Sequence, residues 1–218
     1  MRTKFVAIAI LGFAAITMAQ TSTAPDLKLR GDRFKPLTYA ELTPQQKTMA
    51  DDVLHGERGS LNGPFNVYLR SPEMGDLAQK LGAYTRFHTS VPKRLNELAI
   101  IITARFWNAQ YEWQAHRKNA AAEGVNQDTI EAIAAGKRPA SMQPDEALVY
   151  DFCTEMLNTR QVSDKTFQAA KSQLGEQRMV DLVAVMGYYA LVSMALNLDR
   201  YPLPEGTKPE LKPLKSGY

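Results

Sequence analysis

The fold of this chain is decided by residues 92–124, PKRLNELAIIITARFWNAQYEWQAHRKNAAAEG. Its first half, Leu95 to Phe106, is apolar on most sides, which is typical of a central helix buried by its neighbours. The sequence Trp107-Asn108-Ala109 predicts a joint, with Asn108 as the N-cap of a second helix. That helix is expected to end at Gly124, a residue type common just beyond helix C-termini. The stretch therefore predicts two consecutive helices.

Similar helix signals occur on both sides of this stretch. Thr43-Pro44 predicts a helix start, with Thr43 as N-cap, Pro44 at N1 and Gln46 in capping-box position. Apolar residues at 3,4 spacing predict a helix over residues 73–87. These residues are Met74, Leu77, Leu81 and Tyr84. Other helices are expected over residues 126–135, 145–157, 163–174 and 176–196. Because no strand-like alternation is found, the sequence predicts an all-α fold, a single domain with about seven or eight helices.

The two ends of the chain differ in composition from the domain, which is expected over residues 43–200. Residues 1–19 combine Arg2 and Lys4 with an apolar run and a small-residue cleavage pattern, which predicts a secretory signal peptide. The alternative is an uncleaved N-terminal anchor. Residues 20–42 are expected to form an N-terminal arm, and residues 201–218, with four prolines, an extended C-terminal arm. The sequence therefore predicts an exported protein, periplasmic or secreted.

Charge and cysteine content exclude several classes of protein. Removing residues 1–19 takes away two of the 26 basic residues and none of the 23 acidic residues, which leaves a net charge of +1. No basic stripe is interleaved with aromatic residues, so we expect no nucleic-acid partner, and no membrane partner after signal cleavage. The one cysteine, Cys153, can form no intramolecular disulfide and is expected to be a small buried side chain.

Glu112 and His116 form the strongest candidate for a chemical site. They are four residues apart on the predicted second helix, so both project from one face. A carboxylate beside an imidazole raises the pKa of the histidine and fixes its tautomer, as a general acid or base requires. The alternative is a plain ion pair on the helix surface. The flanking Tyr111 and Trp113 favour a partly buried setting.

Glu97 is the second candidate. It interrupts the apolar run from Leu95 to Phe106, where a charge is costly to bury unless it is paired or functional. It is therefore expected to be either a partner of an arginine, such as Arg94 or Arg105, or a member of the site. The three histidines have no metal-ligand spacing, and no phosphate-binding or dinucleotide-binding motif is found, so neither metal nor cofactor is expected.

Several segments together resemble the carboxymuconolactone decarboxylase family. They occur in the family's order and spacing and cover roughly residues 40–204. The segments are Gly63-Pro64-Phe65-Asn66-Val67, Ser71-Pro72-Glu73, Arg94-Leu95-Asn96-Glu97-Leu98-Ala99-Ile100, Ala109-Gln110-Tyr111-Glu112-Trp113 with His116, Gly175-Glu176-Gln177 and Gly187-Tyr188-Tyr189. The resemblance implies an all-helical fold of the alkylhydroperoxidase D type, assembled into a homotrimer or homohexamer with active sites near subunit contacts.

This family has two branches with different chemistry. In the thiol branch a C-x-x-C motif precedes the histidine, and a glutamate lies twelve residues before the first cysteine. Here the glutamate and histidine positions match Glu97 and His116, but the cysteine positions are occupied by Ala109 and Glu112. Peroxidase chemistry needs a reactive thiolate and a resolving partner. The resemblance to the thiol branch is therefore incomplete at the residues that carry its chemistry.

The other branch decarboxylates an unsaturated lactone acid without metal or cofactor. We therefore expect a carboxymuconolactone decarboxylase-like lyase acting on such a lactone or a related small carboxylic acid. In this hypothesis His116 carries the proton, Glu112 is its partner, and Glu97 is a second acid or a positioning group. Two alternatives stay open: a peroxiredoxin-like or alkylhydroperoxidase-like reductase, and a non-catalytic exported protein that binds a small molecule in the same pocket.

Self-association is expected from the sequence as well as from the resemblance. The loop 58–72 and the run 180–198 carry more apolar residues than a monomer of this length usually needs. Met186, Tyr188, Tyr189 and Met194 are the residues expected to contribute to such contacts.

Overall fold

The computed structural model describes residues 24–214, and within that range the chain has eight α-helices and no strand. The helices are α1 (Pro44–His55), α2 (Phe65–Tyr68), α3 (Pro72–Ala83), α4 (Lys93–Phe106), α5 (Gln110–Ala122), α6 (Gln127–Ala134), α7 (Pro144–Thr159) and α8 (Asp164–Leu198). A 3₁₀ turn, Tyr39–Glu41, precedes α1, and a π-helical turn, Tyr84–His88, follows α3. The all-α prediction is confirmed. The signal peptide predicted over residues 1–19 lies outside the described residues.

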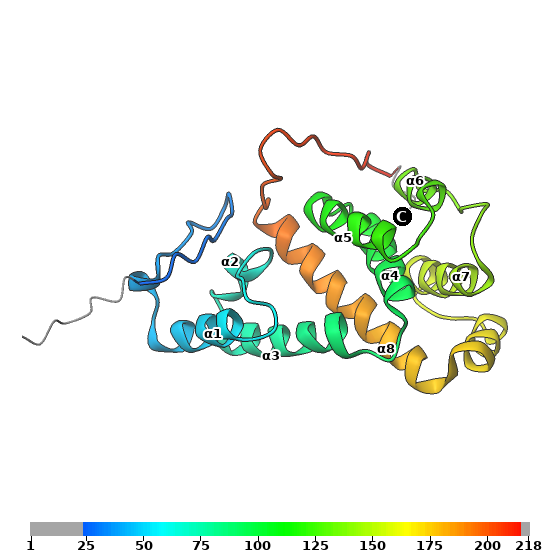
Figure 1. The fold of residues 1–218 in the computed structure, drawn as a ribbon, viewed down its shortest axis with the longest axis horizontal. Coiled ribbons are helices and arrows are strands. Elements are labelled where there is room, and N and C mark those ends of the chain that lie inside the picture. The colour runs from blue at the N-terminus through cyan, green and yellow to red at the C-terminus, as the bar shows by residue number, and fades with distance from the viewer. Residues whose placement is uncertain (1–23, 215–218) are drawn as a thin grey trace, which may run out of the picture.

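The long helix α8 runs between two groups of helices (Figure 1). It contacts α4, α5 and α7 on one side and α2 and α3 on the other. Gly175 interrupts α8 with a backbone φ of 78°, a conformation that a residue without a Cβ adopts readily. The two helices predicted over residues 163–174 and 176–196 are therefore present; they meet at a kink at Gly175 and together make up α8.

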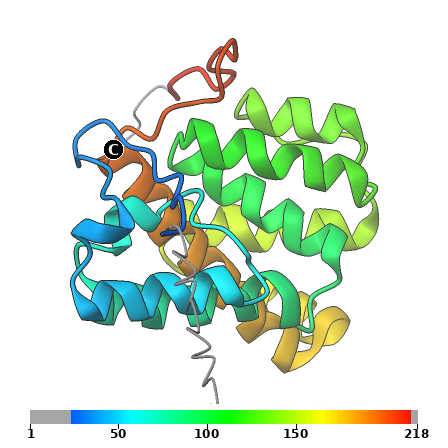
Figure 2. The same ribbon diagram turned by 60° about the vertical axis from the view of Figure 1, so that its left-hand side comes forward.

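An 18-residue window of α8 is apolar enough to span a bilayer, but 61% of that window is buried inside the protein. That burial is typical of a core helix in a globular domain. Figure 2 shows the N-terminal arm beside the last turns of α8. The buried carboxylate of Asp199 fixes the arm there, since it accepts hydrogen bonds from the backbone N–H groups of Arg33 and Phe34, at 2.9 and 2.7 Å.

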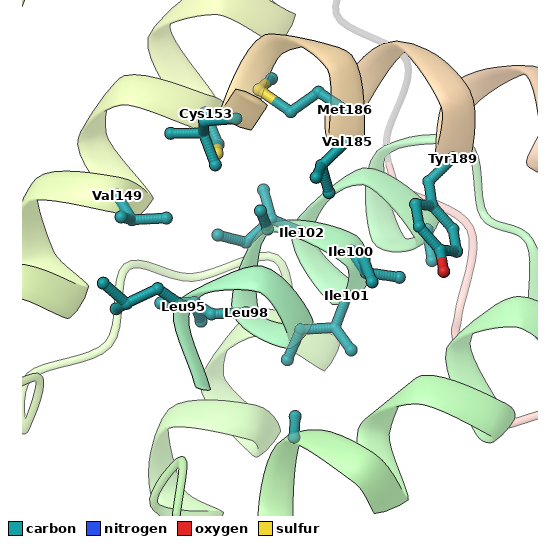
Figure 3. Packing of buried hydrophobic residues seen from close by; sticks show 14 of the residues in the cluster. Leu95, Leu98, Ile100, Ile101, Ile102, Val149, Cys153, Val185, Met186 and Tyr189 are labelled. Atoms are coloured by element: carbon teal, nitrogen blue, oxygen red, sulfur yellow. The ribbon is translucent and has the colours of Figure 1, made fainter. Parts of the chain in front are cut away.

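The larger hydrophobic core surrounds α4, as the apolar sequence of this helix predicts. Leu98, Ile100 and Ile101 are fully buried, and Figure 3 shows them among side chains of α7 and α8. Burying an aliphatic side chain of this size contributes about 1.5–3 kcal/mol. A second core lies between the N-terminal arm, α1 and α2, where Phe65 and Tyr68 are fully buried. The larger core packs α4 against α8, and the second core reaches α8 through Ala195.

The joint between α4 and α5 differs from its prediction in one detail. Asn108 is not the N-cap; its φ is +51° and Ala109 takes the N-cap position. Asparagine tolerates this left-handed conformation better than most residues. The guanidinium of Arg105 donates a 3.0 Å hydrogen bond to the Asn108 side-chain oxygen, which stabilises the turn. The reversal folds α5 back onto α4, and the two helices are in contact.

The segment before α4 is more ordered than predicted. The expected loop, residues 58–72, contains α2, whose residues are largely buried. The helix predicted over residues 73–87 exists, but its last turn is π-helical from Tyr84 to His88. A π-turn inserts one extra residue per turn and is often found at functional sites. Periodicity alone does not distinguish it from an α-helical turn.

The apolar residues that predict α3 lie largely on its exposed face. Leu77 is 70% exposed, and Met74, Leu81 and Tyr84 are also exposed. On α8 the prediction of exposed apolar residues is correct for Met194 but wrong for Met186, Tyr188 and Tyr189, which are buried. The exposed apolar residues of that helix are Val180, Val183, Met194 and Leu198.

Candidate active site

His116 lies between two carboxylates, one from its own helix and one from α4. Its Nε2 is 3.0 Å from Oε1 of Glu112, one turn earlier on α5. Its Nδ1 is 2.7 Å from Oε2 of Glu97, in the first turns of α4. The hairpin of α4 and α5 brings together Glu97, eleven residues before Asn108, and His116, eight residues after it. All three predicted site residues therefore come together.

The surroundings favour the charged form of His116. Ionised carboxylates only accept hydrogen bonds, so both ring nitrogens donate when both acids are ionised. Burial alone would lower the pKa of His116, but the charge and hydrogen bond of Glu112, followed by those of Glu97, outweigh burial and raise this pKa to about 9. At neutral pH this pKa favours the imidazolium, so the site carries a proton that a general acid could transfer.

The alternative of a surface ion pair does not fit this geometry. The side chains of Glu112 and His116 are each 6% exposed and that of Glu97 is 13% exposed. Glu97 contacts His116 and not the arginines considered from the sequence. Arg94 instead binds Glu146 and Asp145 of α7, at 2.5 and 2.7 Å.

A cavity of about 220 Å³ adjoins this group of residues. Both Glu112 and His116 line it, whereas Glu97 is not among its lining residues. Glu97 is thus placed to orient and charge the ring from the side away from the cavity. The remaining lining residues are Arg58, Ser60, Asn62, Gly63, Pro64, Arg86, Tyr111, Ala115, Asn119, Tyr188, Tyr189 and Val192.

The sequence did not identify several of these residues as members of the site. Arg58 comes from the segment before α2, Arg86 from the π-turn, and Tyr188 and Tyr189 from α8. The Tyr189 ring meets the His116 ring edge to face, with centroids 4.9 Å apart. Tyr188 and Tyr189 were expected at subunit contacts, and the segment Gly187-Tyr188-Tyr189 supports the resemblance, but neither observation placed them in the site.

The residues that match the cysteines of the thiol branch have no thiol chemistry here. Ala109 is the buried N-cap of α5, and Glu112 binds His116. Within residues 24–214, no group of three or more His, Cys, Asp or Glu side chains is arranged to hold a metal ion. What the site offers is an imidazolium, two carboxylates and a partly enclosed cavity, which are the components of acid–base chemistry.

Cys153 is separated from this site by its position in the main core. It is fully buried on α7, and Figure 3 shows it near Ile102, Val149 and Met186. Burial also raises the pKa of its thiol. Both properties are expected of a structural cysteine.

We expect Cys153 to react with a disulfide reagent such as Ellman's reagent at least ~10²-fold more slowly in the native protein than in urea, because reaction requires opening of the core. The rate of thionitrobenzoate release measures this. Labelling of the native protein as fast as that of the unfolded chain would contradict the buried assignment.

Comparisons with known proteins agree with the fold. No protein-family model and no curated protein matches this sequence. Among solved structures, the alkylhydroperoxidase AhpD core of an uncharacterised peroxidase-related protein from Ralstonia eutropha JMP134 matches with a TM-score of 0.64 and 14% identity, over 79% of this chain and 92% of that one. A protein of unknown function from Agrobacterium tumefaciens, described as a candidate antioxidant-defence protein AhpD, matches with a TM-score of 0.54 and 14% identity, over 66% of this chain and 100% of that one.

These similarities define the class of this protein by its architecture. The chain has an AhpD-like all-helical fold. At 14% sequence identity, these matches establish the fold, but the activity of the matched proteins cannot be assigned to this chain. The chemistry must therefore be argued from the residues at the cavity.

Proposed function

We propose that this protein is a cofactor-free enzyme that moves a proton on a small carboxylic acid, as a decarboxylase related to the carboxymuconolactone decarboxylases. The observation that carries this proposal is the buried ring of His116, held between two carboxylates at the wall of a partly enclosed cavity. An acid poised in this way is what protonation of a carbanion or enolate requires.

The proposed reaction has two steps. The bond between the substrate carbon and its carboxylate breaks, CO₂ leaves, and the electron pair moves into the conjugated carbonyl to give an enolate. A proton from the His116–Glu112 pair then adds to the carbon and restores the carbonyl. The pair regains a proton from water when product leaves. His116 is the proton carrier, Glu112 shares its Nε2 proton at the cavity wall, and Glu97 positions the ring through Nδ1.

A thiol reductase is the weaker hypothesis. The fold neighbours include a peroxidase-related protein. In this chain, however, Ala109 and Glu112 occupy the thiol positions, and Cys153 is buried outside the cavity. A peroxide substrate would meet no thiolate in this site.

The proposed activity is tested by incubating the purified protein with a panel of unsaturated lactone acids and following their absorbance and the release of CO₂. We expect turnover of at least one member. Hydroperoxide consumption that depends on Cys153 would replace this proposal with the reductase. Saturable binding across the panel with no turnover would support the binding protein instead.

We further propose that the protein self-associates into a trimer or hexamer. The exposed apolar residues of α3 and α8 support contact with a second copy, because side chains such as Leu77 and Val180, 70% and 68% exposed, are left uncovered by the rest of the chain. A helix face of this kind is stable in water chiefly when another surface covers it. Gly187 leaves room for close approach, since a Cβ there would meet no heavy atom within 4 Å.

Light scattering at micromolar concentration should give a mass several-fold higher than that of one chain. Replacing Val180 with Asp should lower that mass, because the charge would have to be buried in the contact. Lys165→Asp, on an exposed residue near the start of α8, is the matched control and should leave the mass unchanged. A monomer mass for the unmodified protein would refute the assembly.

The N-terminal sequence supports a last proposal, that the enzyme acts outside the cytoplasm, in the periplasm or after secretion.

A further inference from the structure

The cavity beside His116 has a positively charged wall that the proposed proton transfer does not use. Arg58 and Arg86 both line the cavity, and their positive charges contrast with the negative charge of Glu112, which lines it too. Arg58 lies over the Phe65 ring, 4.7 Å from its centroid, and donates a 2.9 Å hydrogen bond to the backbone oxygen of Asn62. These contacts fix its position but leave other donors of the guanidinium unused.

Buried hydrogen-bond donors near these arginines lack partners among the described residues. They are Nε of Arg58 and the hydroxyls of Tyr68 and Tyr188. Tyr188 is only 3% exposed and lines the cavity. A buried donor without a partner costs free energy, so such groups usually have an acceptor in the functional state. Of these residues, Arg58 and Tyr188 line the cavity, where a ligand would supply the missing hydrogen-bond acceptor.

Tyr188 lines the same cavity as both arginines, and their charges act on its hydroxyl. Burial raises the pKa of Tyr188 to about 12; Glu112 adds to this increase, while Arg58 and Arg86 oppose it. The hydroxyl reaches its position because residue 82 is a glycine: a Cβ there would overlap the Tyr188 hydroxyl. Arg86 is held by the π-turn after α3, and Gly82 lies just before that turn.

The net charge of the cavity group favours an anionic ligand. Arg58, Arg86 and the imidazolium of His116 are positive, and Glu97 and Glu112 are negative, which leaves one positive charge unbalanced. A carboxylate supplies the balancing negative charge and can accept several hydrogen bonds at once. At about 220 Å³ the cavity is smaller than the roughly 300–1,000 Å³ of drug-sized ligand sites.

We propose that Arg58, Arg86 and Tyr188 form a recognition site for a carboxylate of a small unsaturated acid. This inference rests on the proposed function, because it orients the reacting end of the same substrate toward Glu112 and His116. The carboxylate bound here is one that the product keeps. Two guanidinium groups stabilise a carboxylate more than neutral CO₂, so they would slow the loss of a carboxyl group that they held.

The probes that test this site are 2-furoate and 2-furamide, two planar molecules of nearly equal size that differ in charge. Isothermal titration should show furoate binding at least ~10-fold tighter than furamide. Arg86→Gln and Arg58→Gln should each weaken furoate binding at least ~10-fold and bring it close to that of furamide. Tyr188→Phe should weaken it several-fold. The control is Arg178→Gln, which removes the charge of an exposed arginine on α8. This variant should bind furoate as tightly as the unmodified protein does.

Arg58→Lys keeps the charge without the planar fork and covers the case in which Arg58→Gln fails to fold. Equal binding of the two probes, no binding of furoate at millimolar concentration, or unchanged binding by the Arg86→Gln and Arg58→Lys variants would overturn the inference. If the protein turns over a lactone acid and the arginine variants have an unchanged KM, the recognition site is refuted and the proposed enzyme activity is supported. If furoate binding depends on the arginines but no lactone acid is turned over, the recognition site is supported and the proposed enzyme activity is refuted.

Discussion

Replacing His116 with Ala is expected to lower kcat by ~10²–10⁴, the usual range for a positioned proton donor. His116 is the group through which both carboxylates act, since Glu97 and Glu112 contact different nitrogens of its ring. Glu112→Gln should cause a loss of similar size, because the amide cannot share the Nε2 proton as a carboxylate does. The measurement is steady-state turnover of the lactone acid that the panel identifies, with melting curves of each variant.

The double variant distinguishes one catalytic unit from two independent contributions. If His116 and Glu112 act together, the double variant should be scarcely slower than the slower single variant. Glu97→Gln should have a smaller effect on kcat but should shift the pH–rate profile to lower pH, since it removes a carboxylate that raises the pKa of His116. His88→Ala, at an exposed histidine that contacts Glu57, should keep full activity. Full activity of His116→Ala would refute the site.

The sequence predicted the helices well because their signals are local. The capping box of Thr43 and Gln46 is present as expected, and Asn126 caps α6. Glu112 and His116 were predictable for the same reason, since four residues on one helix fix their relation. Helix periodicity, however, could not distinguish a face that packs in the core from one that is exposed, and Leu77 lies on the exposed face.

The rest of the site depends on tertiary structure. Glu97 meets His116 only because the turn at Asn108 folds α5 back onto α4. Arg58 and Arg86 lie at the cavity because of a loop and a π-turn, neither of which has a period that the sequence displays. Tyr188 also depends on the absence of a side chain at Gly82, more than 100 residues earlier in the chain. Such relations are set by packing and not by local pattern.

The buried position of His116 predicts a loss of stability at alkaline pH. Its pKa is about 9 in the folded protein, against 6.5 for an unperturbed histidine. The folded state therefore binds the proton more tightly, so the added stability is complete below pH 6.5 and is lost as the pH rises through 9. At ~1.4 kcal/mol for each pKa unit, the free energy of unfolding should fall by about 3 kcal/mol across this window. Urea titrations at several pH values between 6 and 9.5 measure this change.

Comparison with two histidine variants assigns the effect to the buried ring. His116→Gln has no group to titrate at this position, so its free energy of unfolding should change little over the same window. His88→Gln removes an exposed histidine that contacts only Glu57 among the carboxylates of the described residues, and it should retain the alkaline loss of the unmodified protein. A parallel decline in His116→Gln and the unmodified protein would show that the two carboxylates do not stabilise an imidazolium. His116 would then not carry the proton that the proposed reaction requires, and Glu112 alone would have to donate it.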